Sequence, residues 1–234
     1  MYGAILFDLD DTLVDFSRCE QAALRAGLAA IEHGLDLDGA WEEIYRAFTP
    51  HSRRHWQEWA QSGAPWTDVS PHVFGDFLRA HGLDPAQAGA AALAYQEHFG
   101  GSPVAHDGAV DAVRALRGRL PLGLISNGVG ALQRTRLRSL GLDDCFDPLL
   151  ISDEVGIRKP DRRIFDLAVE RLGLPRRRIL FVGDSIGDDL VGAADAGLAF
   201  CHFARRGGAD YPPGYRPDHV VSGFDELIDV IVPS

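Results

Sequence analysis

The segment that most constrains this chain is an apolar run that ends directly in carboxylates. Residues 4–12 read Ala-Ile-Leu-Phe-Asp-Leu-Asp-Asp-Thr. An apolar run without alternation predicts a strand that is buried on both faces, as in a parallel sheet covered by helices. Residues two apart on a strand point the same way, so Asp8 and Asp10 are expected to emerge together at its carboxyl end. Aspartates also follow strands as helix caps or turn formers, but three of them with Thr12 in five positions favour a functional site.

A second apolar run ends in an acid far downstream. Residues 179–184 read Ile-Leu-Phe-Val-Gly-Asp, and Asp188 and Asp189 follow within one turn's reach of Asp184. Close carboxylates repel each other unless a cation lies between them or one is protonated. Oxygen-only clusters suit a hard cation, and Mg²⁺ binds a few carboxylates while it keeps several waters. Neither acidic segment contains His or Cys, which argues against zinc.

Two further segments between the acidic runs carry groups that suit an anion. Residues 122–128 read Leu-Gly-Leu-Ile-Ser-Asn-Gly, which predicts another buried strand that ends just before a helical pattern. The hydroxyl of Ser126 and the backbone N–H groups that follow it can hold anionic oxygens. Lys159 supplies a compact positive charge in a loop that Pro160 stiffens.

The pattern of elements predicts an α/β chain with a Rossmann-like parallel sheet. Residues 1–15 and 103–234 alternate buried strands with amphipathic helices, so they are expected to form one α/β core. The expected strands are 4–8, 122–126, 148–151, 179–183, 198–203 and 218–221. The expected helices are 107–117, 129–140, 161–172, 187–196 and 224–231. Ligands of such sheets bind at the carboxyl ends of the strands, where all these polar segments fall.

Residues 16–102 contain no comparable strand run and predict an inserted α-helical domain. Its helices are expected to break at Gly34, at Gly63-Ala64-Pro65 and at Gly82, and the segment from Gly100 to Pro103 is expected to be the return connection. The insertion holds all four tryptophans of the chain, namely Trp41, Trp56, Trp59 and Trp66. Packing in a small helical core is the favoured interpretation of these residues. The alternative is that one or two of them, with Arg53 or Arg54, contact a substrate.

Composition narrows the class of partner. The chain of 234 residues carries 34 acidic and 23 basic side chains, for a net charge of −11. This balance disfavours nucleic acid or an anionic membrane as the main partner. The three cysteines share no metal or redox spacing, and no charged leader or membrane-length apolar stretch is found. The sequence therefore predicts a cytoplasmic protein with reduced thiols, as a monomer or a homodimer.

Together these segments resemble the signature motifs of the haloacid dehalogenase superfamily, on its phosphatase side, with a helical cap inserted after the first motif. The motifs are Asp8-Leu9-Asp10-Asp11-Thr12, Ser126-Asn127-Gly128, Lys159-Pro160 and Gly183-Asp184-Ser185 with Asp188 and Asp189. The joints between them also resemble the family pattern, for example Leu132-Gln133 through Leu137, Ile164-Phe165 and Gly192-Ala193. The resemblance covers almost the whole core, while the insertion lies outside it.

The resemblance implies a role for each motif residue. Asp8 is expected to be the nucleophile that forms an aspartyl-phosphate, and Asp10 to protonate the leaving oxygen and then deprotonate the hydrolytic water. A carboxylate at Asp10 also separates the phosphatases of the family from its dehalogenases. The remaining expected contacts with the substrate come from Thr12, Ser126, Asn127 and Lys159, of which Ser126 and Lys159 also count as catalytic. Thr12 is expected to hold the loop around Asp8.

The resemblance also implies a magnesium site. Its expected ligands are Asp8, the backbone carbonyl of Asp10, and Asp184, with support through water from Asp188 or Asp189. Counting back from Gly192-Ala193 favours Asp189, and both residues stay open at this point.

The function expected from these observations is a Mg²⁺-dependent phosphomonoesterase that acts on a small phosphorylated metabolite. Nucleoside monophosphates, sugar phosphates and flavin mononucleotide all remain open as substrates. A phosphomutase of the same superfamily is the first alternative. A dehalogenase would work without metal, which Asp10 and Asp184 argue against, and a non-catalytic binding protein would have little need of the full set of motifs.

Overall fold

The computed structural model describes residues 2–62, 65–205, 207 and 210–232. The chain divides into two compact units, one formed by residues 1–16 and 103–234 and the other by residues 17–102. We call them the core unit and the inserted unit. The sequence analysis placed the first boundary after residue 15, and the structure places it after Phe16.

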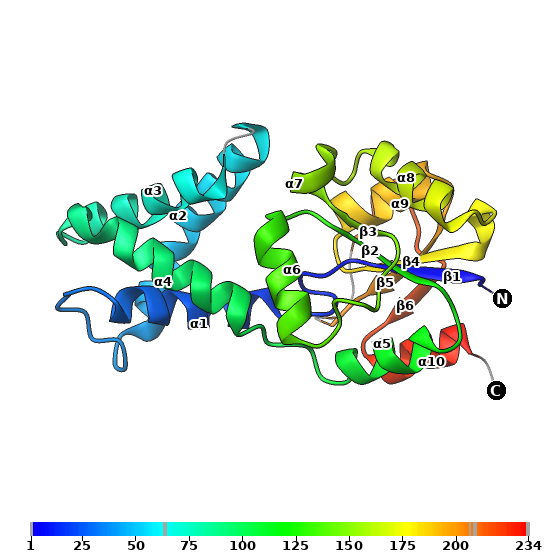
Figure 1. Cartoon of the computed structure of the whole chain (residues 1–234), viewed down its shortest axis with the longest axis horizontal. Coiled ribbons are helices and arrows are strands. Elements are labelled where there is room, and N and C mark those ends of the chain that lie inside the picture. The colour runs from blue at the N-terminus through cyan, green and yellow to red at the C-terminus, as the bar shows by residue number, and fades with distance from the viewer. Residues whose placement is uncertain (1, 63–64, 206, 208–209, 233–234) are drawn as a thin grey trace. The chain divides into compact units, whose positions relative to one another are not determined.

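The core unit contains a six-stranded parallel sheet in the order β3-β2-β1-β4-β5-β6 (Figure 1). The strands are β1 (Ala4–Phe7), β2 (Leu122–Ser126), β3 (Leu149–Ile151), β4 (Ile179–Gly183), β5 (Ala199–Phe203) and β6 (His219–Val221). All six were expected from the sequence, and no end differs by more than one residue. The predicted fold class is confirmed. The order places β1 between β2 and β4. The motifs that begin at Asp8, Ser126 and Gly183 therefore lie at the carboxyl ends of three neighbouring strands.

Helices cover both faces of this sheet, as Figure 1 shows. On one face α8 (Arg162–Leu172) and α9 (Val191–Asp195) pack on apolar side chains of β1 to β5, and the Phe165 ring lies 5.1 Å from that of Phe181. On the other side lie α5 (Ala109–Arg117) and α10 (Phe224–Ile231), where Phe203 of β5 meets Phe224 at 4.7 Å. The remaining elements of this unit are α6 (Gly130–Ser139), α7 (Ser152–Val155), the 3-10 turn η2 (Arg176–Arg178) and the π-helical turn η3 (Ile186–Leu190). A sheet covered in this way has strands that are apolar throughout, which explains the uninterrupted runs in the sequence.

The inserted unit is helical. It consists of α1 (Phe16–Ala29), α2 (Trp41–Ser62), α3 (Trp66–Ala80), the 3-10 turn η1 (Pro85–Gln87) and α4 (Ala88–Gly101). Gly34 and Gly82 lie between helices as expected, and Pro65 directly precedes α3, while Gly63 and Ala64 lie outside the described residues. Gly100 and Gly101 are the last residues of α4, so the return connection begins only at Ser102. No helix of the described residues is both long enough and apolar enough to cross a membrane.

The tryptophans of the inserted unit pack on one another. Trp56 stacks on Trp66 with ring centroids 4.0 Å apart, and Trp59 meets both rings edge-on at 5.4 and 5.7 Å. Trp41 stacks on Tyr45, and its indole N–H donates to Gln21. These contacts agree with the interpretation that the tryptophans build the core of this unit.

We predict that Gly192→Ala destabilises the core unit. A Cβ at this position of α9 would lie 2.4 Å from Phe165 Cε2 and 3.0 Å from the carbonyl oxygen of Pro160, so α9 has to move away from α8 and the loop that precedes it. Overpacking of this kind lowers the free energy of unfolding by about 1–3 kcal/mol, in spite of alanine's higher helix propensity. Denaturant unfolding measures the change, with Gly118→Ala as the control because no atom lies within 4 Å of its Cβ. Equal stability of the two variants would contradict the prediction.

Candidate active site

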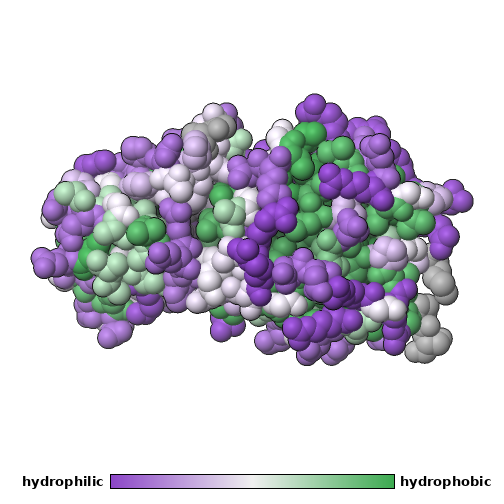
Figure 2. Space-filling model, viewed as in Figure 1, coloured by the Kyte–Doolittle hydropathy of each residue, from purple (hydrophilic) through white to green (hydrophobic). Residues whose placement is uncertain are grey.

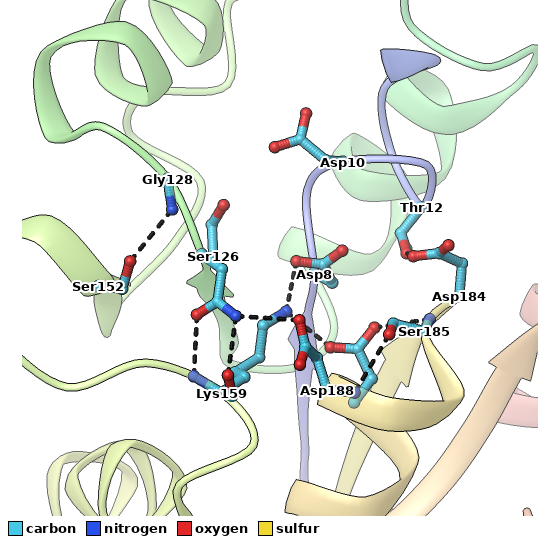
Figure 3. Close-up of polar contacts among 12 residues, drawn as sticks. Asp8, Asp10, Thr12, Ser126, Gly128, Ser152, Lys159, Asp184, Ser185 and Asp188 are labelled. Carbon is cyan, nitrogen blue, oxygen red and sulfur yellow. Dashed lines mark hydrogen bonds and ion pairs between the residues drawn. The ribbon is translucent and has the colours of Figure 1, made fainter. Parts of the chain in front are cut away.

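Three carboxylates meet at the carboxyl ends of the two central strands. Phe7 of β1 is in register with Val182 of β4, and the Asp8 N–H donates to the Val182 carbonyl at 2.9 Å. Asp8 and Asp184 therefore leave the same edge of the sheet, and η3 returns Asp189 to it. One carboxylate oxygen from each of Asp8, Asp184 and Asp189 lies within 4.8 Å of the others. Figure 3 shows the Asp8 and Asp184 side chains at this edge.

Lys159 holds two of these carboxylates. Its Nζ donates to Asp8 Oδ1 at 2.5 Å and to Asp189 Oδ1 at 2.7 Å. Only 2% of the lysine is exposed, and burial alone would lower its pKa. The charges and hydrogen bonds of Asp189 and Asp8 outweigh burial and raise the pKa of Lys159, so the ammonium keeps its proton. A permanent positive charge therefore stands beside the expected nucleophile.

One ammonium does not balance three carboxylates. Burial, followed by the charges of Asp189 and Asp11, raises the pKa of Asp184 from its ordinary value of 3.8 to about 7. Burial also raises the pKa of Asp8, and the neighbouring Asp189 and Asp184 add to it against the opposing effect of Lys159. Repulsion of this kind is relieved by a bound cation. The oxygen-only donor set fits Mg²⁺, with Asp8, Asp184 and Asp189 as the side chains that would hold it.

The two neighbouring aspartates of η3 have different surroundings. Asp189 is fully buried in the cluster, where its second oxygen accepts a hydrogen bond from the Ser185 N–H at 3.0 Å. Asp188 instead accepts from Asn127 Nδ2 at 3.2 Å (Figure 3). Gly183 leaves the room for Asp189, because a Cβ there would lie 2.3 Å from Asp189 Oδ2. The geometry thus favours Asp189 over Asp188 beside a metal.

Asn127 binds the protein backbone in this structure. Its Oδ1 accepts from the Lys159 N–H at 2.8 Å, and its Nδ2 donates to the Lys159 carbonyl at 3.0 Å. These two bonds connect the end of β2 to the loop that carries Lys159. The sequence analysis expected Asn127 to contact substrate, whereas the described contacts of its side chain position Lys159 and Asp188.

The backbone after β2 is also partly engaged. The Gly128 N–H donates to Ser152 Oγ at 3.2 Å (Figure 3). The Gly130 N–H donates to Asp153 Oδ2 at 3.0 Å, and both acceptors belong to α7. The sequence analysis expected N–H groups here to hold anionic oxygens. Gly128 and Gly130 serve instead to join α6 to α7, a short helix that the sequence analysis did not predict. Ser126 remains in the expected place at the end of β2 and is 1% exposed.

Asp10 and Thr12 lie in the loop after Asp8, and their side chains have different partners. Thr12 Oγ1 lies 3.5 Å from Asp184 Oδ1, so it connects the first motif to the last. Asp11, between them, has a left-handed φ of 58° and its carboxylate accepts from the Phe16 N–H. Asp10 points away from the carboxylates of Asp8 and Asp184 in Figure 3.

Two buried side chains of α6 bind Asp10. Arg136 Nη1 donates to Asp10 Oδ1 at 2.5 Å, and Gln133 Nε2 donates to Asp10 Oδ2 at 2.7 Å. The sequence analysis noted Gln133 only as part of a connecting pattern and did not consider Arg136. A signal was present, because both residues fall on the helix face that Val129 and Leu137 bury, and polar residues at core positions point to a site.

His202 is a second residue that the sequence analysis missed. Its Nε2 lies 3.1 Å from the Asp184 carbonyl oxygen and therefore donates to it, while Nδ1 faces the Tyr211 hydroxyl at 2.9 Å. Burial lowers the pKa of this imidazole. His202 thereby fixes the backbone that carries Asp184.

Similarity to known proteins identifies the family of this chain. Residues 2–197 match the family model of the haloacid dehalogenase-like hydrolases. The chain belongs to this family. The expected resemblance is thus confirmed, and the hydrolase assignment with it.

Relatives of this hydrolase include phosphatases. The glyceraldehyde 3-phosphate phosphatase of Methanopyrus kandleri is 31% identical over 99% of this chain and 97% of its own. The pyrimidine 5'-nucleotidase YjjG of Escherichia coli is 46% identical, but that alignment spans about half of each protein, 51% of this chain and 53% of the relative. An (S)-2-haloacid dehalogenase of Pseudomonas sp. is 35% identical over 51% of this chain and 52% of its own.

A solved structure supports the same fold. The putative hydrolase YfnB of Bacillus subtilis, determined with bound magnesium, superimposes with a TM-score of 0.82 at 25% identity and covers 99% of both chains.

We predict that magnesium stabilises this hydrolase more at about pH 8 than at about pH 6. Because the pKa of Asp184 is raised in the folded state, protonation of its carboxylate stabilises the metal-free fold. This contribution to stability is complete below pH 3.8 and is lost as pH rises through about 7. Mg²⁺ binds the deprotonated carboxylates, so its benefit grows over the same range. Saturating Mg²⁺ is expected to raise Tm by about 5 °C at the higher pH. Asp184→Asn should remove most of the pH difference, and equal Tm shifts at both pH values would contradict the prediction.

Proposed function

We propose that this hydrolase is a Mg²⁺-dependent phosphomonoesterase that acts on a small phosphorylated metabolite through an aspartyl-phosphate at Asp8. The observation that carries the proposal is the contact of Asp8 with a buried ammonium beside two further carboxylates. The chain as a whole carries a net charge of −11, which repels a phosphate dianion. A nucleophilic carboxylate therefore needs positive charge close to it before it can attack the phosphate. Phosphatases among the relatives support the same reaction class.

The residues of the first motif would perform the two half-reactions. Asp8 attacks phosphorus, the bond to the leaving oxygen breaks, and the phosphoryl group is carried on the Asp8 carboxylate. Asp10 protonates the leaving oxygen, then takes a proton from the water that hydrolyses the aspartyl-phosphate. Phosphate leaves and Asp8 is restored. Bound Mg²⁺ would supply neutralisation of the negative charge shared by Asp8 and the transferring oxygens.

The second and third motifs would bind the transferring group. Lys159 lies at hydrogen-bond distance from Asp8, so its ammonium can also contact a phosphoryl oxygen that Asp8 attacks. Ser126 at the end of β2 offers a hydroxyl, and Asn127 keeps Lys159 in place. Thr12 holds the loop of the first motif against Asp184.

The dehalogenase relative makes halide displacement the competing reaction. Both reactions begin with attack by a carboxylate, but displacement of halide needs neither a metal nor a residue that protonates the leaving group. The cluster of Asp8, Asp184 and Asp189 is costly to bury without a cation, and this favours the phosphatase. A phosphomutase would use the same cluster, and it differs in requiring a bisphosphate and in releasing little phosphate.

The setting of the reaction follows from charge and thiol chemistry. The net charge of −11, with hydrophilic residues over much of the visible face (Figure 2), favours a small metabolite over nucleic acid. Cys19, Cys145 and Cys201 are buried and form no disulfide, which supports a cytoplasmic enzyme. We propose a monomer or homodimer.

The test is phosphate release from a panel of phosphomonoesters and 4-nitrophenyl phosphate. We expect turnover with Mg²⁺ and loss of turnover with excess chelator, because the carboxylates repel substrate without the cation. Asp8→Asn should keep its fold, seen by circular dichroism, and lose kcat by about 1000-fold or more since an amide cannot act as the nucleophile. Asp161→Asn, at the half-buried N-cap of α8, is the matched control, because asparagine caps a helix as well as aspartate does. Full activity in chelator, or near-normal turnover of Asp8→Asn, would refute the proposal.

We assign substrate selectivity to the inserted unit. The motif residues of the core can contact only phosphoryl oxygens and metal, which every phosphomonoester offers. Within the inserted unit, Arg53 lines a pocket of about 580 Å³ together with Ser17, Tyr45, Arg46 and Thr49. The other two candidates from the sequence have partners within the inserted unit. Arg54 forms an ion pair with Asp76, and Trp56 stacks on Trp66.

We predict that Arg53→Ala changes the ratio of kcat/KM values among natural phosphomonoesters by about 10-fold and leaves 4-nitrophenyl phosphate nearly unaffected. Arg54→Ala, one residue away, is the control because its guanidinium pairs with Asp76 on α3. That control should lower Tm and scale all substrates equally. If Arg53→Ala also scales all substrates equally, selectivity lies elsewhere.

A further inference from the structure

Both oxygens of the Asp10 carboxylate are bound by side chains of one helix. Arg136 Nη1 donates to Oδ1 and Gln133 Nε2 donates to Oδ2, at 2.5 and 2.7 Å. Arg136 is fully buried and Gln133 is 3% exposed, whereas a quarter of the Asp10 side chain is exposed. Arginine is seldom buried to this extent unless it is paired. The helix α6 thus places a buried cation behind Asp10, a carboxylate of the first motif that the metal cluster does not include.

The same network includes Ser126. Gln133 Nε2 donates to Ser126 Oγ at 2.9 Å as well as to Asp10, so its two amide hydrogens serve one residue each. Gln133 Oε1 accepts from Arg136 Nη1 at 2.8 Å. Because a guanidinium only donates, it sets which end of the amide faces Asp10 and Ser126. Ser126 Oγ accepts from Gln133, so its own hydroxyl hydrogen stays available for an acceptor such as a phosphoryl oxygen.

We propose that Arg136 and Gln133 are positioning residues for phosphoryl transfer, which hold the side chains of Asp10 and Ser126 in the orientations in which each acts. The inference rests on the proposed phosphatase function. An in-line displacement puts the leaving oxygen on the side of phosphorus opposite Asp8, so Asp10 has to point away from the Asp8 carboxylate to reach it. Figure 3 shows Asp10 in this direction.

The pairing leaves Asp10 able to react. A carboxylate has about four lone-pair sites, and Arg136 and Gln133 use one on each oxygen. The remaining sites can meet the leaving oxygen or the hydrolytic water. Without the two donors, the carboxylate on its loop can rotate, and a displacement of about 1 Å in a proton-transfer group costs about 100-fold in rate.

A double-mutant cycle tests the proposal. Arg136→Met and Asp10→Asn are made singly and together, and kcat is measured with Mg²⁺ on an alkyl phosphate and on 4-nitrophenyl phosphate. We expect Arg136→Met to lower kcat on the alkyl ester by about 100-fold in the wild-type background and by less than about 2-fold in the Asp10→Asn background. KM should change little. A merely structural role would lower kcat equally in both backgrounds and overturn the proposal.

Controls separate positioning from folding. Arg138→Met makes the same substitution at an exposed position of α6 and should leave kcat unchanged. Gln133→Met removes the amide without removing a buried charge, so it carries the same cycle if Arg136→Met fails to fold. We expect Gln133→Met to lower kcat and also to raise KM, because it frees Ser126 as well as Asp10. Arg136→Lys should recover part of the lost kcat, since it restores one donor to Asp10.

The outcomes distinguish this inference from the proposed function. Absence of hydrolysis by the wild-type chain would overturn both. Hydrolysis by the wild type with unchanged kcat in folded Arg136→Met and Gln133→Met would overturn only the positioning role. Loss of kcat in the wild-type background that disappears in the Asp10→Asn background supports it.

Discussion

The ammonium of Lys159 between the carboxylates of Asp8 and Asp189 is the interaction on which the site depends. Three carboxylates at one sheet edge would repel one another strongly in a buried place, and Lys159 offsets part of that repulsion before any metal binds. Asn127 fixes the backbone of Lys159 from the next strand, and Ser185 N–H fixes Asp189. The remaining charge imbalance, visible in the raised pKa values of Asp8 and Asp184, favours binding of a cation by the cluster.

The family uses one strand framework for more than one reaction, and the differences lie in a few side chains. Strand β1 places Asp8 at the carboxyl end of the sheet, and this position suits attack on phosphorus as well as attack on a carbon–halogen bond. In the proposed reaction, the additional carboxylates Asp10, Asp184 and Asp189 would add a proton carrier and a cation site, both of which phosphate esters need and organic halides do not. Fold alone therefore decides little about function here, and the site decides the reaction class.

Helix α6 has a larger part in the site than its sequence position suggests. Its buried Arg136 and Gln133 face Asp10 and Ser126, while its exposed Arg134 pairs with Glu154 of α7. One helix thus ties the first motif, the second motif and the segment after β3 together. Rigid second layers of this kind hold reacting groups within the small tolerance that catalysis requires.

The sequence by itself predicted the strands of the sheet and the order of the motifs, because buried parallel strands are continuous apolar runs. It also indicated Asp8, Asp184 and Lys159 as candidate site residues, because ligands of such sheets bind at the carboxyl ends of the strands. Only the tertiary structure decided that Asp189 lies in the carboxylate cluster, that the Asn127 side chain binds the Lys159 backbone, and that Asp10 pairs with Arg136. Spacing from Gly192-Ala193 favoured Asp189 and left Asp188 open, because the directions of adjacent side chains on a π-helical turn depend on the folded backbone. The Asp10–Arg136 contact joins residues 126 positions apart, and such a contact exists only once β1 and β2 lie side by side.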